Sequence, residues 1–83
     1  MEYYLFIARS VTHAQRMARA LDRCGVSAAV LRAPTSLSKV GCAYAVRLRR
    51  SHADAALDCL RRAQLTPEHI YVREENGYRE VIR

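Results

Sequence analysis

Residues 26–48, with the sequence VSAAVLRAPTSLSKVGCAYAVRL, contain the arrangement that decides the fold. Two short apolar runs, Val26–Leu31 and Ala43–Leu48, stand on either side of a segment from Pro34 to Cys42 that holds a proline, hydroxyl residues, a lysine and a glycine. Short apolar runs bounded by turn residues are typical of strands. The sequence therefore predicts two strands joined by a loop that ends on Cys42.

Upstream of this segment, Tyr3–Ala8 is almost wholly apolar and predicts a strand that is covered on both sides or lies at the centre of a sheet. Residues 11–24 predict a helix whose buried stripe recurs at helical spacing: Val11, Ala14, Met17, Ala18 and Leu21. Ser10 or Thr12 can serve as its N-cap, since Thr12 with Gln15 matches a capping box, and Gly25 supplies its C-terminal stop.

Downstream, Ser51 with Asp54 repeats the capping pattern and predicts a second helix, which Thr66–Pro67 ends. Its expected buried stripe comprises Ala53, Ala56, Leu57, Leu60 and Ala63 or Gln64. Residues 70–73 predict a fourth strand. Asn76–Gly77 is a strong signal for a two-residue hairpin that leads to a fifth strand over 78–82.

Each half of the chain thus reads strand, capped helix, strand. Two such halves predict an α+β fold, the ferredoxin-like β-α-β-β-α-β two-layer sandwich, as a single domain over residues 1–83 with an added C-terminal hairpin over 73–83. Both helices should cover one face of the sheet. The strand over 43–48 should lie beside the strand over 3–8.

Composition limits what this domain can be. Eighty-three residues with 51% apolar and 27% charged residues are typical of one small globular domain. No apolar run can span a bilayer, and the N-terminus lacks the pattern of a secretory signal. Three widely spaced cysteines, Cys24, Cys42 and Cys59, favour free thiols in a reducing compartment. We therefore expect a cytoplasmic protein without membrane contact.

The formal charge of +6 rests almost entirely on arginine, since Lys39 is the one lysine. Such a charge attracts anionic partners, but arginine-rich solvated faces produce the same composition. A nucleic-acid module of the RNA-recognition kind needs aromatic residues on the open face of its central strands. The candidates are Tyr44 on one central strand and Tyr3, Tyr4 and Phe6 on the other, without an RNP pattern, so we do not expect nucleic acid as a partner.

The predicted connectivity brings the loop to the end of the sheet where the first helix begins. Cys42 should lie there with Gly41, and the loop and its neighbours should supply binding groups for a substrate or partner: Ser38, Lys39, Arg9, Arg32, Ser10 and Thr12. A helix N-terminus and cationic side chains lower the pKa of a thiol. We predict a depressed pKa for Cys42, with His13 or His69 as its proton acceptor. His69 should share this end, and His52 the other.

The remaining cysteines carry no predicted chemistry. Cys24 and Cys59 fall at the edges of the helical stripes, where packing is the expected role. Tight ligand pairs such as Cys-x-x-Cys or His-x-x-x-His are absent from the sequence, so we expect neither a metal site nor a cofactor. Cys42 itself has a second interpretation, as a small apolar residue that closes the start of a strand.

Several segments together resemble the family of selenium/sulfur carrier-like proteins: Leu5-Phe6, Gly25-Val26, Pro34-Thr35 and, most specifically, Leu37-Ser-Lys-Val-Gly-Cys-Ala43. The resemblance covers about residues 3–72. It implies a ferredoxin-like domain whose Cys42 carries a persulfide or selenopersulfide, with Gly41 as the turn glycine. Family members often have glycine where this chain has Ala43. The implied partners are a cysteine desulfurase or other chalcogen donor and an acceptor protein.

On this basis we expect a carrier or adaptor rather than a turnover enzyme. The main alternative is an interaction or regulatory domain without chemistry, because ferredoxin-like units often pair through their sheets and a fold alone licenses no function. In that interpretation a homodimer would form through the 78–82 edge. A nucleic-acid-binding module is the third and weakest alternative.

Overall fold

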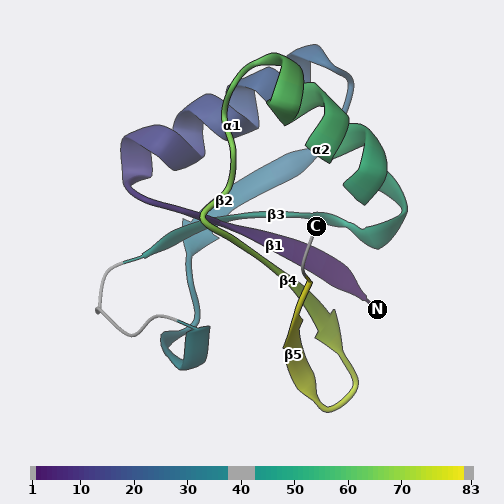
Figure 1. Cartoon of the computed structure of the whole chain (residues 1–83). Helices are drawn as coiled ribbons and strands as arrows, with labels where there is room; N and C mark the ends of the chain where they lie inside the picture. The colour runs from purple at the N-terminus through teal and green to yellow at the C-terminus, as the bar shows by residue number, and fades with distance from the viewer. Residues whose placement is uncertain (1, 38–42, 82–83) are drawn as a thin grey trace.

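The structure, a computed structural model, describes residues 2–37 and 43–81 (Figure 1). Along the chain its elements are β1 (Tyr3–Ala8), α1 (Val11–Arg23), β2 (Ala28–Arg32), the 3-10 turn η1 (Thr35–Leu37), β3 (Tyr44–Arg49), the 3-10 turn η2 (Arg50–His52), α2 (Ala53–Arg62), β4 (His69–Glu74) and β5 (Gly77–Glu80).

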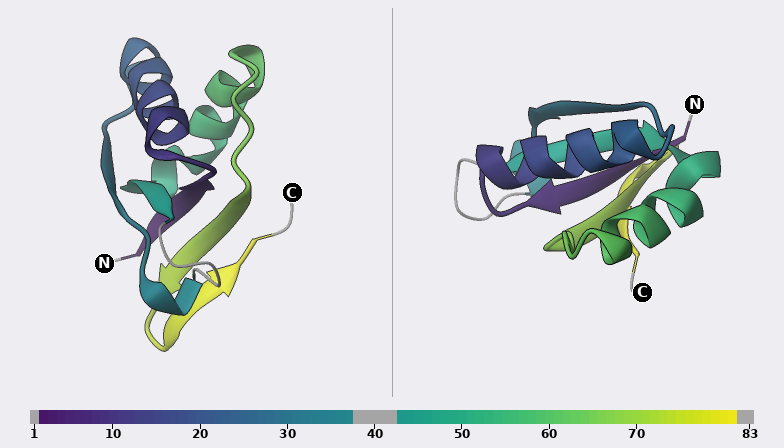
Figure 2. Two further views of the ribbon diagram at one scale, coloured as in Figure 1. Left: turned by 90° about the vertical axis from the view of Figure 1, so that its left-hand side faces the viewer. Right: turned by 90° about the horizontal axis from the view of Figure 1, so that it is seen from above.

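The strands form one five-stranded sheet in the order β2-β3-β1-β4-β5, and every neighbouring pair is antiparallel. The predicted adjacency of β1 and β3 is confirmed, with Phe6 opposite Val46. β1 and β2 are both antiparallel to β3 and therefore run in the same direction. Figure 2 shows both helices on one side of this sheet, so the predicted α+β class and layering are confirmed.

The main core lies between the sheet and the helices. Alternate residues of β1, Tyr4, Phe6 and Ala8, point towards this layer, as the period of two in a strand requires. From α1 they meet Met17 and Leu21, both fully buried. The expected stripe of α1 differs at several positions. Val11 is 39% exposed and Ala18 is only partly buried, whereas His13 and Ala20 are buried.

The sheet face opposite the helices carries a smaller core of its own. Leu5, Ile7 and Ala45 are buried there under partly buried side chains that include Leu31 and Leu37. β1 is therefore covered on both faces. This double burial explains why its sequence is a continuous apolar run rather than an alternating one.

Of the predicted capping residues, Ser10 is confirmed, whereas Thr12 and Ser51 do not cap a helix. Ser10 is the N-cap of α1, and its Oγ accepts a hydrogen bond from the amide of His13 at 3.1 Å. Thr12 is therefore an exposed residue of the first turn, and its proposed capping box is not used. Ser51 does not cap α2 either, because it lies inside η2 and the N-cap, His52, makes no side-chain capping bond.

Neither described helix is long and apolar enough to cross a membrane.

Both helices end in the same way. The amides of Gly25 and Val26 donate to the carbonyls of Asp22 and Leu21, which is the pair of bonds of a Schellman motif. Gly25 has a φ of +78°, as the motif requires, and confirms the predicted stop. At the end of α2, Gln64 takes the equivalent position with a φ of +58°, a left-handed conformation without a glycine.

The C-terminal hairpin is present, but its turn lies one residue earlier than predicted. Glu74 pairs with Gly77, which makes Glu75–Asn76 the two connecting residues and Gly77 the first residue of β5. Asn76 is not in a left-handed conformation, so the turn is not of the type that the Asn76–Gly77 pair indicates. β5 does extend the sheet beside β4, as expected.

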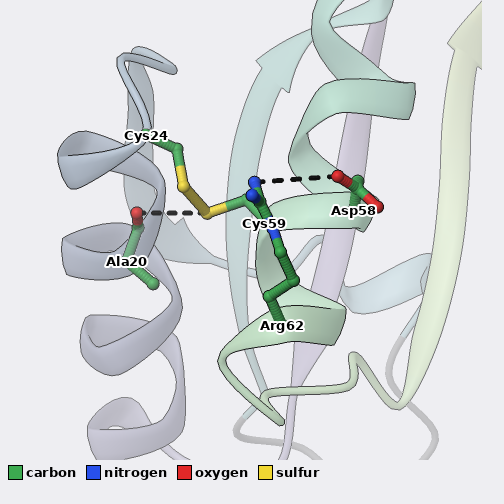
Figure 3. The surroundings of a disulfide bond; sticks show 5 residues. All are labelled: Ala20, Cys24, Asp58, Cys59 and Arg62. Carbon is green, nitrogen blue, oxygen red and sulfur yellow. Dashed lines mark hydrogen bonds and ion pairs between the residues drawn. A yellow bond between two sulfur atoms is a disulfide. The ribbon is translucent and has the colours of Figure 1, made fainter.

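The prediction of three free thiols is wrong. Cys24, at the end of α1, and Cys59, in the buried stripe of α2, form a disulfide with Cα atoms 6.5 Å apart (Figure 3). Cys24 is exposed and Cys59 is buried. These cysteines therefore join the two helices covalently rather than merely packing, and the cysteine count no longer supports a reducing compartment.

Candidate functional site

Four residues of the predicted site, Ser38, Lys39, Gly41 and Cys42, lie outside the described residues. The structure does place the two chain segments that lead to them. Pro34 and η1 follow β2 in the chain, and Ala43 directly precedes β3.

These two segments are held together at the base of the loop. The amide of Ala33 donates a hydrogen bond to the carbonyl of Ala43 at 2.9 Å, which extends the β2–β3 pairing by one step. Leu37 and Ala43 both pack against the small core on the helix-free face of the sheet. Residues 34–42 therefore begin and end at one edge of that face.

The strand register shows which other residues share this end of the sheet. Ala8 and Arg32 both lie opposite Tyr44, and Ile7 lies opposite His69. Arg9 and Ser10 follow directly after Ala8. The end of β1, the start of α1 and both ends of the loop thus lie at one pole, whereas η2 with His52 follows the far end of β3.

Three of the predicted polar residues at this pole, Arg9, Ser10 and His13, already have partners. Arg9 forms an ion pair with Glu68, with Nε and Oε1 3.5 Å apart, and both side chains are substantially exposed. The amide of Glu68 also donates to the carbonyl of Ile7 at 2.8 Å, which fixes the 66–68 turn against β1. Glu68 carries no signal in the sequence, because nothing in its local pattern links it to Arg9. Its carboxylate reduces the positive charge that Arg9 presents.

His13 is engaged in a way that affects its predicted role. It is only 6% exposed, and its Nδ1 accepts a hydrogen bond from the amide of Arg9 at 3.1 Å. Because Nδ1 is the acceptor, the proton of the neutral ring lies on Nε2, which is buried. The lone pair that would accept a proton from a thiol is therefore occupied.

Burial lowers the pKa of His13, and the charges of Arg9 and Arg16 lower it further. The carboxylate of Glu68 and the main chain of Thr66 act in the opposite direction without reversing the shift. His13 is thus held neutral near pH 7. The geometry assigns it to fixing the β1–α1 junction rather than to accepting protons.

The start of α1 itself favours an anion at this pole. The first turn contains no acidic residue, so the positive end of the helix dipole is not neutralised from within the helix. Arg32 adds a further cation on β2. A thiolate at this pole would gain from both.

The disulfide determines which cysteine remains available. The chain has three cysteines, and Cys24 is bonded to Cys59, so Cys42 has no partner left within the chain. A signal for this pairing was present in the sequence, because both cysteines lie on helices predicted to cover the same sheet face.

Among the described residues, no cluster of histidine, cysteine or carboxylate side chains is suited to a metal ion.

Comparison with known proteins gives one match. The family model described as "Putative Se/S carrier protein-like" matches residues 3–72, which is most of the 83-residue chain. The chain belongs to this family. The matched range contains Cys42, the disulfide and all the elements from β1 to most of β4, and it stops before β5. No curated protein and no solved structure shows significant similarity to the chain.

Proposed function

We propose that this protein carries sulfur or selenium on Cys42, as a persulfide or selenopersulfide, between a donor and an acceptor protein. The observation that carries the proposal is the family match over a range in which Cys42 is the single cysteine outside the disulfide. A carrier needs one available thiol and no resolving cysteine beside it. This chain meets that requirement once Cys24 and Cys59 are paired.

The transfer follows the chemistry of thiol–disulfide exchange. The Cys42 thiolate attacks the outer sulfur of a persulfide on the donor, the donor's S–S bond breaks, and the donor cysteine leaves as a thiolate. Cys42 now holds the outer sulfur. A nucleophile of the acceptor then attacks that sulfur, and Cys42 leaves as a thiolate, so no net oxidation takes place.

Positive charge at the pole supports both steps, because Cys42 acts as attacking thiolate in one and as leaving thiolate in the other. We assign this effect to the start of α1, to Arg32 and, in part, to Arg9. Ser38, Lys39 and Gly41 are proposed to contact the partner proteins. Thr12 is exposed on the first turn and joins them, whereas the hydroxyl of Ser10 is used in capping.

We further propose that the arrangement is the ferredoxin-like one, with β5 added at its edge as part of the same domain. The β-α-β-β-α-β order and the position of β1 between β3 and β4 support this assignment. We propose the cytoplasm as its location, where Cys42 is kept reduced. The proposal requires that the Cys24–Cys59 disulfide resist reduction there, so that Cys42 stays the single thiol.

The proposal is tested by loading the oxidised protein, without reductant, from a cysteine desulfurase with cysteine and, separately, from a low-molecular-weight persulfide. Intact mass should rise by one sulfur atom, and peptide mapping should locate the sulfur on Cys42. Addition of dithiothreitol should remove it. Cys42→Ser should gain no mass. Failure to load from both donors would contradict the carrier function.

A further inference from the structure

The helix-free face of the sheet brings tyrosines and arginines from separate strands together. Along one row of the register, Tyr3 of β1 lies between Arg49 of β3 and Arg73 of β4, and Arg73 lies opposite Tyr78 of β5. In the next row Arg47 and Tyr71 flank Leu5. We call this set the tyrosine–arginine face: Tyr3, Arg47, Arg49, Tyr71, Arg73 and Tyr78.

Its central side chains contact one another directly. The hydroxyls of Tyr3 and Tyr78 lie 3.1 Å apart, and their rings meet edge to face with centroids 6.5 Å apart. The guanidinium of Arg47 lies 5.8 Å from the ring centre of Tyr3, and that of Arg73 lies 5.1 Å from the ring centre of Tyr78. These contacts hold the planar groups in fixed positions at the surface.

The positive charge of this face is not neutralised. Within residues 2–37 and 43–81, Arg47, Arg49 and Arg73 have no carboxylate at ion-pair distance, and the same holds for Arg16, Arg19 and Arg23 on α1. Five arginines elsewhere pair with nearby acids: Arg9 with Glu68, Arg50 with Glu2, Arg61 and Arg62 with Asp58, and Arg79 with Glu74. Glu80 lies opposite Tyr71, but it bonds to His69. The face therefore presents three cations to an anionic ligand.

The surface beside these groups is hollowed. A depression of about 450 Å³ adjoins Tyr3, Arg47 and Arg49, and its other lining residues include the small side chains of Ser27, Ala28 and Ala29. Tyr3, Arg47 and Arg49 thus border the same open space as Leu48 and three small residues. A planar ligand that also carries negative charge fits this combination.

We propose that the tyrosine–arginine face binds single-stranded nucleic acid. Bases stack on tyrosine rings and guanidinium planes, phosphates neutralise the arginines, and the hollow beside Tyr3 receives one base. A single strand fits better than a duplex because its bases expose their faces. The sequence pattern indicated aromatic residues only on the two central strands, and three of these, Tyr4, Phe6 and Tyr44, belong to the helix-side core. Strand pairing adds Tyr71 and Tyr78 to the helix-free face.

The test is fluorescence anisotropy of the oxidised full chain with labelled oligo-dT and oligo-U from 50 to 200 mM salt. We expect binding at 50 mM salt, weaker binding to a duplex, and a salt slope that falls by about 2 in Arg47→Gln/Arg49→Gln/Arg73→Gln, since each lost phosphate contact removes about 0.7. Affinity at 50 mM salt should fall at least about ten-fold in this variant. No binding by the unmodified protein, or equal binding to the duplex, would overturn the proposal.

The matched control is Arg16→Gln/Arg19→Gln/Arg23→Gln on the exposed side of α1, which removes the same charge from the opposite layer. It should keep its salt slope and most of its affinity. An equal loss in both triple variants would show that only net charge matters and would contradict the proposal.

Stacking is tested separately at Tyr3. Tyr3→Leu should weaken binding about ten-fold, in line with the loss of one stacked base. Tyr3→Phe keeps the ring but loses the hydroxyl contact to Tyr78, and should bind within about two-fold of the unmodified protein by the same reasoning. Because Tyr3→Phe controls for effects on folding, a similar loss in both variants would exclude stacking on this ring.

Discussion

Cys24 and Cys59 form a disulfide that connects the C-cap residue of α1 to a residue within α2, across 35 positions of sequence. Its two halves have unequal surroundings, since Cys24 is exposed and Cys59 is buried. Cys59 Sγ also lies 3.2 Å from the carbonyl oxygen of Ala20 (Figure 3). A disulfide sulfur has no proton to donate, but the reduced thiol would donate a hydrogen bond to that oxygen.

Reduction of this disulfide should lower the free energy of unfolding by about 3 to 4 kcal/mol, the value that loop-closure entropy gives for a loop of this length. Urea unfolding with and without dithiothreitol measures the difference. Cys24→Ser should reproduce the reduced stability without creating a cavity, because Cys24 is exposed. Cys42→Ser should leave the effect of the reductant unchanged, and an equal effect of reductant in Cys24→Ser would contradict this assignment.

The two Schellman motifs should respond in opposite ways to substitution. Gln64→Gly should stabilise the fold by about 1 kcal/mol, because glycine adopts a φ of +58° without the steric cost of a Cβ atom. Gly25→Ala should destabilise it by about 1 kcal/mol for the same reason, since open space around Gly25 excludes a clash as the cause. Thermal unfolding of both variants measures the two changes in stability. Changes of the same sign in Gln64→Gly and Gly25→Ala would contradict the prediction.

Stability should fall as pH decreases below the ordinary pKa of histidine, 6.5, because His13 resists protonation in the folded state. The folded pKa is depressed, so the unfolded chain binds more protons below pH 6.5, and this loss continues until the folded pKa is reached. His13→Asn keeps an acceptor for the Arg9 amide but does not titrate. Urea unfolding at pH 7.5 and 5.5 should show a smaller decrease in this variant than in the unmodified protein.

Cys42 should titrate below the ordinary thiol value of about 8.5. In the oxidised protein it is the single thiol, so the rate of alkylation by iodoacetamide against pH reports on it alone. Arg32→Gln should move the midpoint upward because it removes a cation from the pole. Arg16→Gln, one turn further along α1, should change it less. A midpoint at the ordinary value would argue against activation of this thiol.

Much of the fold was predictable from the sequence because burial leaves a clear pattern. β1 has the predicted bounds, Tyr3–Ala8, since its burial on both faces demands a continuous apolar run. β2 begins at Ala28 rather than Val26 because the Val26 amide is used to close α1 and cannot enter the sheet. The hairpin turn lies one residue earlier than the Asn76–Gly77 pair predicts, because the pairing of β4 with β5 sets the register.

The site was less predictable, because its decisive contacts join positions that are distant in sequence. Residue spacing placed the loop and the start of α1 at one pole, but it could not show that Glu68 pairs with Arg9 or that His13 is fixed by the Arg9 amide. The cysteine pairing depends on the distance between two helices. Helical periodicity defines the face of each helix, not that distance.

The hydrogen bond between Ala33 and Ala43 also has a consequence for how this domain can diversify. Because the pairing of β2 with β3 is already complete at this bond, the register of the sheet does not depend on the length or composition of residues 34–42. Doubling the length of such a segment costs only about 0.6 kcal/mol in closure entropy. Evolution or design can therefore exchange residues 34–42 for a segment with different chemistry while the scaffold stays unchanged.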